Sequence, residues 1–529
     1  MTEQTNWNGK TAEEWIEALL HYALAHGMME PMDTTYTRNG LLDLFQLEAP
    51  AAKQIQPMQH AHMQPLPLTD ILTPLIDMAA ERGLIPDNTV TERDLFDARI
   101  MGLVMPRPSA VEHRFQHIRR EHGIERATTD FYKLSQHANY IRMDRIRKNL
   151  YWEHQTEYGN LQITVNLSKP EKDPKEIAKL RQAKTVHYPQ CVLCKENVGY
   201  AGRVDHPARQ NLRILPFQLN EENWYFQYSP YLYYEEHSIV FREEHVPMQI
   251  TGQTFRRLLD FTEQMPHYFI GSNADLPIVG GSILSHDHFQ AGKHRFPIED
   301  AKDIYSYQSI EETNVRASIV AWPMSVVRLT GRCKEEVARA AEALLAAWKG
   351  YSDAEHEIQA YSEQAGERIP HNSITPIVRR NGENYVMDLV LRNNRTNEEH
   401  PEGIFHPHRP LHHIKKENIG LIEVMGLAIL PGRLQEELSA IERIIKGEDA
   451  LSELAADSPL HKHRTWIAEM MEADVRPDSL TEAEGETWLH EQVGEKFSRV
   501  LADAGVFKQT ESGRAGFDQF MIQSGWQRK

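Results

Sequence analysis

Apolar residues recur at helical spacing through most of the first 150 residues. The clearest helix begins after Thr11 and Glu14, which form a capping-box pair, and ends before a glycine. Its apolar face is made of Trp15, Leu19, Leu20 and Ala23. Segments 70–82 and 112–122 carry mixed charge and weaker apolar stripes. We therefore predict a mostly helical N-terminal region over residues 1–150.

Aromatic and β-branched runs separated by turn signals dominate the middle of the chain, which is typical of antiparallel strands. Strands are predicted at 161–167, 212–217, 224–234, 237–242, 318–329 and 384–392. Amphipathic helices are predicted at 334–349, 434–446 and 486–502. The pattern indicates an α+β chain that ends in a helical C-terminal segment over 433–529.

Composition is that of an ordinary globular protein. With 529 residues, 40% hydrophobic and 25% charged, the chain is long enough for two or more domains. No apolar run approaches the ~20 residues of a membrane span, and the N-terminus lacks a basic-then-apolar signal. Three cysteines exclude a disulfide framework and fit a reducing compartment. We expect a cytoplasmic protein with no membrane partner.

The formal charge of −18, from 58 basic and 76 acidic side chains, disfavours a broad nucleic-acid surface. Binding of a small anionic ligand would then require a locally positive pocket in a protein whose net charge is negative. A charged, proline-bearing loop at 168–174 either reaches such a ligand or only connects two elements. Several histidines carry no recognisable motif and are expected to be solvated: His60, His62, His113 and His117.

The densest chemistry lies between residues 275 and 292. In an extended strand His286, His288 and Gln290 would share one face, about 6.5–7 Å apart in succession. Two imidazoles and a carboxamide can bind a metal, attack phosphorus or hold an oxyanion, and they also occur on plain polar strand faces. Gly280 and Gly281 permit positive φ or a close approach of the backbone to a ligand.

A second candidate is the pair Cys191 and Cys194, separated by two residues. Thiolates at this spacing can grip one metal ion or form a dithiol redox centre, and two buried thiols are the plain alternative. No thioredoxin-like βαβ pattern surrounds the pair. The third cysteine, Cys333, has no such neighbour and is interpreted as a bystander.

The stretch His286-Asp287-His288-Phe289-Gln290 resembles the active-site signature of the galactose-1-phosphate uridylyltransferases, in the histidine-triad superfamily. The first type of that family has His-Pro-His-Gly-Gln here, so the chain resembles the second type, over roughly residues 130–435. The resemblance implies an α+β fold of two histidine-triad-like antiparallel-sheet halves, with helical N- and C-terminal segments. We place the catalytic half at 151–300 and the second half at 301–432.

The resemblance also implies an activity: exchange of UMP between UDP-glucose and galactose 1-phosphate, through a uridylyl-histidine. His288 would be the nucleophile and Gln290 the donor to a phosphate oxygen. Weaker candidates for substrate contact are Ser285, Gly280, Gly281 and Asn273. No organic cofactor is expected, and a homodimer is an open expectation.

The first type binds zinc through its matching cysteine pair and two histidines. Carried over to this chain, the ligands of a structural zinc would be Cys191, Cys194, His245 and His286. The pair His406 and His408, with His371, resembles a second metal motif, but a histidine-rich loop or a phosphate contact fits equally, and it is left unassigned. Two other classes of protein are alternatives to the transferase. The first is a metal-dependent or histidine-triad nucleotide hydrolase, and its metal-dependent form would use His286, Asp287 and His288 as ligands. The second is a non-catalytic zinc-scaffold or sugar-nucleotide-binding protein.

Overall fold

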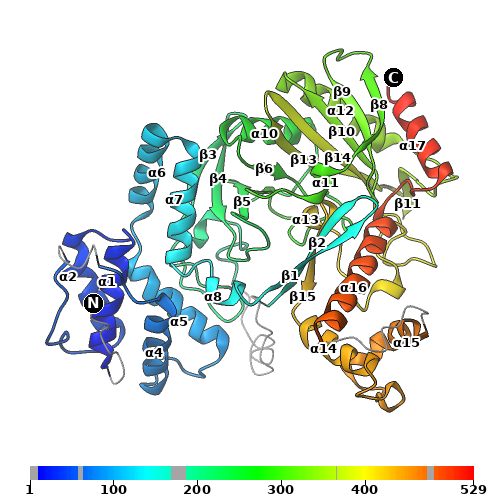
Figure 1. Cartoon of the computed structure of the whole chain (residues 1–529). Coiled ribbons are helices and arrows are strands. Elements are labelled where there is room, and N and C mark those ends of the chain that lie inside the picture. Colours follow the sequence, from blue (N-terminus) through cyan, green and yellow to red (C-terminus); the bar gives the residue numbers. More distant parts are fainter. Residues whose placement is uncertain (1–9, 58–62, 168–185, 365, 473–481) are drawn as a thin grey trace.

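Helices form two opposite ends of the molecule, and strands lie between them (Figure 1). The structure is a computed structural model that describes residues 10–57, 63–167, 186–364, 366–472 and 482–529. The predicted loop at 168–174, together with His60 and His62, lies outside these ranges. No helix in the described ranges is long and apolar enough to cross a bilayer.

The N-terminal region is helical, as predicted. Its helices are α1 (Ala12–Ala25), α2 (Thr34–Leu44), α4 (Leu68–Glu81), α5 (Val90–Val104), α6 (Pro108–His122), α7 (Ile124–His137) and α8 (Met143–Ile146). The capping box of α1 is formed: the Thr11 amide donates to Glu14 Oε2 at 2.9 Å, and the Glu14 amide donates to Thr11 Oγ1 at 3.4 Å. His113 and His117 are exposed, as expected.

An eleven-stranded sheet forms the centre of the molecule, in the order β16-β8-β9-β10-β14-β13-β6-β7-β5-β4-β3. Its first-half strands are β3 (Leu215–Leu219), β4 (Glu222–Tyr228), β5 (Ser238–Arg242), β6 (Phe269–Gly271) and β7 (His288–Gly292). Its second-half strands are β8 (Asp303–Ser309), β9 (Arg316–Val320), β10 (Val326–Gly331), β13 (Asn372–Asn381) and β14 (Asn384–Asn393). All pairings between these strands are antiparallel.

The two halves repeat one topology. In each half the third strand is followed by a helix, α10 (Gly252–Gln264) or α12 (Lys334–Gly350), and the strand order is β6-β7-β5-β4-β3 or β13-β14-β10-β9-β8. The halves join edge to edge where β6 pairs with β13, with Gly271 opposite Ile377. The two expected halves are therefore present and share one continuous sheet. Their predicted boundary at residue 300 lies between β7 and β8 and stays a prediction.

A smaller sheet covers the face of the large sheet that α10 and α12 leave free. It contains β1 (Leu150–Thr156), β2 (Gly159–Asn166) and β15 (Leu427–Pro431), and β15 runs parallel to β2. One apolar core joins β2 and β15 to Ile377 and Val390 of the large sheet. The other core lies on the opposite face and includes Phe289 of β7. The gap between the two sheets is where the candidate site lies.

The C-terminal helices lie beside both sheets: α16 (Glu482–Ala504) contacts β1 and β2 of the small sheet, and α17 (Glu511–Gln523) contacts the edge strand of the large sheet. They are α14 (Leu434–Ile445), α15 (Arg464–Glu472), α16 (Glu482–Ala504) and α17 (Glu511–Gln523), followed by β16 (Trp526–Arg528) at the edge of the large sheet. The predicted helices at 434–446 and 486–502 are confirmed as α14 and α16. Two short helices lie near the site, α11 (Pro297–Asp300) and α13 (Leu421–Val424).

Prolines explain where strand predictions ran too long. The strand predicted at 318–329 is two strands, β9 and β10, separated by a turn that contains Pro323. The strand predicted at 224–234 ends at Tyr228, two residues before Pro230. Pro216 lies within β3, which is tolerated because β3 is the last strand of the sheet.

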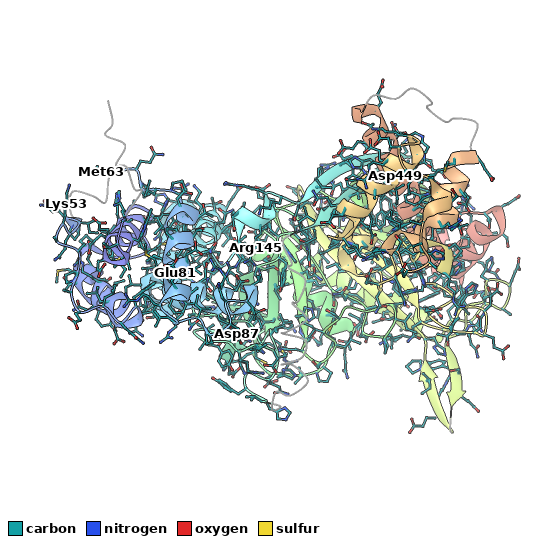
Figure 2. All side chains as sticks on the ribbon, turned by 90° about the horizontal axis from the view of Figure 1, so that it is seen from below. Lys53, Met63, Glu81, Asp87, Arg145 and Asp449 are labelled. Atoms are coloured by element: carbon teal, nitrogen blue, oxygen red, sulfur yellow. The ribbon has the colours of Figure 1, made fainter. Side chains whose placement is uncertain are left out.

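A hairpin of β11 (Tyr361–Gln364) and β12 (Glu367–Pro370) projects from the second half (Figure 2). In the same view the helical N-terminal region, with Glu81 and Asp87, extends away from the sheets at the far end of the molecule. Neither feature contributes to the candidate site, because no described residue before Asn166, or between Gln290 and Lys415, is among its lining residues.

Candidate active site

A cavity of about 890 Å³ lies between the two sheets. Its lining comes from β7, from the turn before it, from β2 and β15, and from the segment that leads into α13. Five of the predicted site residues line this cavity: His288, Gln290, Gly280, Gly281 and Asn273. The segment 415–423, about 130 positions after β7 in the sequence, lines the same cavity.

His288 begins β7 and presents one free ring nitrogen. Phe289 stacks on Trp224 at 4.8 Å in the core behind the strand, so the alternation of the strand turns His288 and Gln290 to the cavity face. His288 Nδ1 lies 2.8 Å from the carbonyl oxygen of His286 and donates its proton there. Nε2 is then the atom with the lone pair. Burial lowers the pKa of His288 to about 4, so the ring is neutral at pH 7.

The strand predicted to carry His286, His288 and Gln290 on one face begins only at His288. His286 lies in the turn before β7, and its Nε2 donates to the carbonyl oxygen of Arg242 at 2.8 Å. Its Nδ1 is 3.3 Å from Cys191 Sγ. The shared face therefore holds for His288 and Gln290, while His286 turns away from the cavity.

The Asp287 side chain points neither to the cavity that His288 lines nor to the thiols beside His286. Its carboxylate lies 3.3 Å from Arg257 Nη1, and Arg257 also binds Glu222 at 2.7 Å. His286, Asp287 and His288 thus face three different surroundings. A hydrolase that uses these three as ligands of one metal is not supported by this geometry.

The glycines make close approaches, but to the chain itself. A Cβ on Gly280 would lie 2.5 Å from the carbonyl oxygen of Ala274, and one on Gly281 would lie 2.6 Å from Asn273 Nδ2. Asn273 in turn accepts from the Leu421 amide at 2.8 Å, which ties the loop to the start of α13. These residues shape the wall of the cavity. Ser285 is exposed and is not among the residues that line it.

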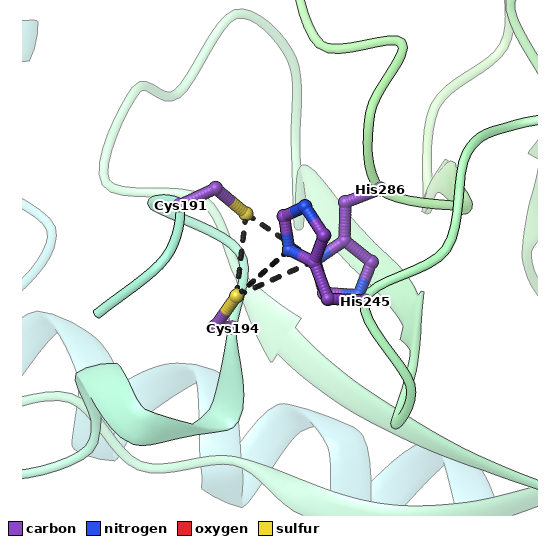
Figure 3. A group of neighbouring side chains, drawn as sticks. All are labelled: Cys191, Cys194, His245 and His286. Atoms are coloured by element: carbon purple, nitrogen blue, oxygen red, sulfur yellow. Dashed lines mark hydrogen bonds between the residues drawn. The ribbon is translucent and has the colours of Figure 1, made fainter. Parts of the chain in front are cut away.

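The four predicted metal ligands converge (Figure 3). Cys191 Sγ and Cys194 Sγ are 3.5 Å apart, and Cys194 Sγ is 3.1 Å from His245 Nδ1 and 3.7 Å from His286 Nδ1. A tetrahedral zinc ion holds sulfur and nitrogen ligands roughly 3.3–3.8 Å apart. Because His286 donates through Nε2, its Nδ1 lone pair faces the thiols. The donor set therefore fits a metal ion.

The second histidine motif does not converge in the same way. His371 uses both ring nitrogens, Nδ1 at 2.9 Å from Asn394 Oδ1 and Nε2 at 2.8 Å from Ser362 Oγ. His408 Nε2 is 3.1 Å from the carbonyl oxygen of Ile404. Across the described ranges, the four Cys and His residues of the first site are the one such group whose ligand atoms come together. His371, His406 and His408 remain without an assigned role.

Sequence reasoning missed the far wall of the cavity. The missed residues that carry side-chain chemistry are Asn166, Tyr233, Lys415, Glu417, Asn418 and Glu423. Lys415 is buried, and its Nζ lies 2.9 Å from Glu423 Oε1. The paired lysines at 415–416, next to a glutamate, an asparagine and a glycine, were the signal that could have drawn attention to this loop.

The charge of the lining differs from expectation. Its described residues carry one ammonium, from Lys415, and two carboxylates, from Glu417 and Glu423. The positive pocket expected for an anion is therefore not found in the described part of the lining. The donors available to a phosphate are then Lys415, backbone amides and the neutral polar side chains of the lining, Gln290 among them.

Two family models match the chain. The galactose-1-phosphate uridyl transferase N-terminal domain matches residues 27–247, and the C-terminal domain of the same family matches residues 261–462. Together they cover well over half of the sequence. The chain belongs to the galactose-1-phosphate uridylyltransferase family. The match begins earlier and ends later than the predicted 130–435, so the N-terminal helices from α2 onward and α14 lie within it, whereas α1 precedes it.

Relatives in the galactose-1-phosphate uridylyltransferase family span nearly the whole chain. The protein of that name from Caldanaerobacter subterraneus is 52% identical over 98% of this chain and 99% of its own. The one from Bacillus subtilis is 48% identical over 97% and 98%. Family membership makes the chain a nucleotidyltransferase, as predicted. Among solved structures, yeast Ap4A phosphorylase covers 67% of this chain and 98% of its own at 10% identity, with a TM-score of 0.31.

Proposed function

We propose that the chain transfers the uridylyl group of UDP-glucose to galactose 1-phosphate by two displacements at His288. The observation that carries this proposal is the single free nitrogen of His288 in the cavity. Nδ1 is committed to the carbonyl of His286, so Nε2 has a fixed direction and a lone pair. The names of the relatives support transfer of a uridylyl group to galactose 1-phosphate.

In the first displacement Nε2 of His288 forms a bond to the α-phosphorus of UDP-glucose. The bond from that phosphorus to the bridging oxygen breaks, and glucose 1-phosphate leaves with the electron pair. In the second, a phosphate oxygen of galactose 1-phosphate attacks the same phosphorus and His288 leaves with its lone pair. UDP-galactose forms, and the enzyme returns to its starting state. A ring whose pKa is held near 4 by burial is neutral and ready to attack at pH 7.

Gln290 lies on the same face of β7 and lines the same cavity. Its carboxamide can donate an N–H to a non-bridging oxygen, whose charge is greatest in the transition state. Lys415, on the opposite wall, supplies the cation for a second phosphate, because its Nζ keeps one donor beyond those held by Glu423 Oε1 and the Ile429 carbonyl.

We propose zinc as the ion at the Cys–His site, held by Cys191, Cys194, His245 and His286. The ion would supply structure, because four protein ligands leave no open position for substrate. Burial raises the pKa of the Cys194 thiol to about 12, so the thiolates need a cation beside them. The site ends two residues before His288 and would hold the carbonyl of His286 in place.

Replacing Cys191 with serine is expected to lower zinc content and melting temperature together. The variant keeps three ligands, and loss of zinc removes a cross-link between the 191–194 turn, the segment after β5 and the turn before β7. Zinc is measured by elemental analysis and melting by calorimetry. Cys333→Ser is the matched control, because Cys333 lies apart at the start of α12. Unchanged zinc and melting in Cys191→Ser would exclude the site.

The function itself is tested by an exchange assay. With UDP-glucose and galactose 1-phosphate together, the protein should form UDP-galactose and glucose 1-phosphate in equal amounts. Brief treatment with a chelator should leave this rate unchanged, since no step uses the metal. Release of free UMP without UDP-galactose would instead identify a hydrolase, and absence of both products would identify a non-catalytic member.

A further inference from the structure

The wall loop of the cavity, residues 274–283, contains a residue in a backbone conformation that its side chain disfavours. Ile278 has a φ of 72°, in the left-handed region. Among the non-glycine residues with positive φ in the described ranges, it alone is β-branched. Such a residue is an outlier there, because its Cβ crowds the following carbonyl oxygen. Pro277 precedes it, and proline followed by positive φ is the arrangement of a type II turn, which normally has glycine in the place of Ile278.

The wall loop is closed at its base and continues directly into the cavity. Ala274 and Gly280 form a parallel β-bridge, and Ile278 lies in the turn between them. A Cβ on Gly280 would lie 2.6 Å from the carbonyl oxygen of Leu276, so the base is tightly packed. Residues 280–283 all line the cavity. A change of φ at Ile278 would therefore redirect the wall that follows it.

Hydrogen bonds to the second half anchor the loop on the approach to Ile278. Asp275 Oδ1 accepts from Ser373 Oγ of β13 at 2.5 Å. The carbonyl oxygen of Pro277 accepts from Asn394 Nδ2, just after β14, at 3.3 Å. Backbone strain persists in a protein when the surrounding structure fixes the strained segment in this way.

The Ile278 side chain packs against a glycine of the second half. A Cβ on Gly403 would lie 3.0 Å from Ile278 Cγ2, so Cγ2 takes the space that a side chain at 403 would need. After the turn, the carbonyl oxygen of Gly280 accepts from Asn418 Nδ2 at 3.4 Å, and Asn418 lines the cavity. The loop is therefore held before Ile278, at its side chain and after it.

We propose that Ile278 is a positioning residue: its contact with Gly403 holds the turn at positive φ and so aims residues 280–283 at the phosphates of UDP-glucose. The inference rests on the uridylyl transfer proposed above. Glycine or asparagine would occupy this position with less strain, so isoleucine is not the residue that backbone stability favours. Strain at a binding site keeps the wall in one arrangement before the ligand arrives.

The test measures stability and activity on the same variants. The melting temperature of Ile278→Gly should exceed that of Ile278→Ala by about 1–3 °C, because alanine keeps the penalty of positive φ and glycine does not. In Ile278→Gly kcat/KM for UDP-glucose should nevertheless fall about tenfold, because a glycine turn without the contact no longer fixes the wall. Ile278→Val keeps the branch that contacts Gly403 and should stay within about twofold of wild-type kcat/KM.

Glu221→Gly controls for relief of strain alone. Glu221 also has positive φ, 64°, but it is exposed in the turn between β3 and β4 and is not among the residues that line the cavity. Asn220 precedes it, and asparagine followed by glycine is the preferred pair for such a turn, so melting should rise by about 1–3 °C. Its kcat/KM should stay within about twofold of the wild type.

Ile278→Asn serves if the glycine variant does not fold, because asparagine tolerates positive φ but lacks the contact, and it should show the same loss of kcat/KM. Three results would overturn the proposal. They are a folded Ile278→Gly or Ile278→Asn protein that keeps more than half of wild-type kcat/KM, a tenfold loss in a folded Ile278→Val protein, and an Ile278→Gly protein that melts below Ile278→Ala. None of them bears on the proposed function, which fails only if the wild-type protein forms no UDP-galactose.

Discussion

Replacing His288 with asparagine should lower kcat for UDP-galactose formation by roughly 10⁴-fold or more, the scale seen when a covalent nucleophile is removed. Asparagine can still donate to the carbonyl of His286, the bond that His288 Nδ1 makes at 2.8 Å. The fold and the neighbouring metal site should therefore survive. What disappears is the lone pair that would attack phosphorus.

Kinetics and calorimetry on the purified His288→Asn protein separate loss of catalysis from loss of folding. Melting temperature and zinc content should match those of the wild type while turnover is lost. His294→Asn, a histidine variant outside the cavity lining, should retain turnover. A His288→Asn protein that keeps more than a hundredth of the wild-type kcat would mean that another group accepts the uridylyl unit.

Replacing Gln290 with alanine should lower kcat by about 10²–10³-fold, as loss of one oxyanion donor does elsewhere. The donor matters most in the transition state, so KM for UDP-glucose should change little.

The Gln290→His variant tests whether Gln290 protects the uridylyl-histidine from water or only positions the substrate. A histidine can protonate a leaving group and assist water, whereas a carboxamide has no proton to give at neutral pH. Transfer should fall, and the ratio of free UMP to UDP-galactose should rise. A histidine variant that loses transfer without a rise in this ratio would show that water is excluded by other parts of the cavity.

Local signals in the sequence predicted local structure well. The Thr11–Glu14 pair begins α1 as expected, and alternation around Phe289 correctly put His288 and Gln290 on one face. The Cys–His group needed the family resemblance, because Cys191 and His286 are 95 positions apart. Spacing alone cannot show that they meet.

The features that the sequence did not predict depend on contacts between residues far apart in the chain. β15 pairs in parallel with β2 more than 260 residues earlier, and this pairing brings Ile429 and Pro431 to the cavity. No period within either segment encodes that partner. Lys415 was likewise missed, because its burial against Glu423 follows from the small sheet closing over the large one.

The most direct measurement of the central claim uses UDP-glucose labelled in its α-phosphate, without an acceptor sugar. The account predicts that glucose 1-phosphate is released and that about one label per chain stays on His288, in an acid-labile and base-stable linkage. Galactose 1-phosphate added afterwards should move the label into UDP-galactose. If exchange proceeds at its full rate while no label is ever retained by the protein, transfer is direct and the covalent role of His288 is contradicted.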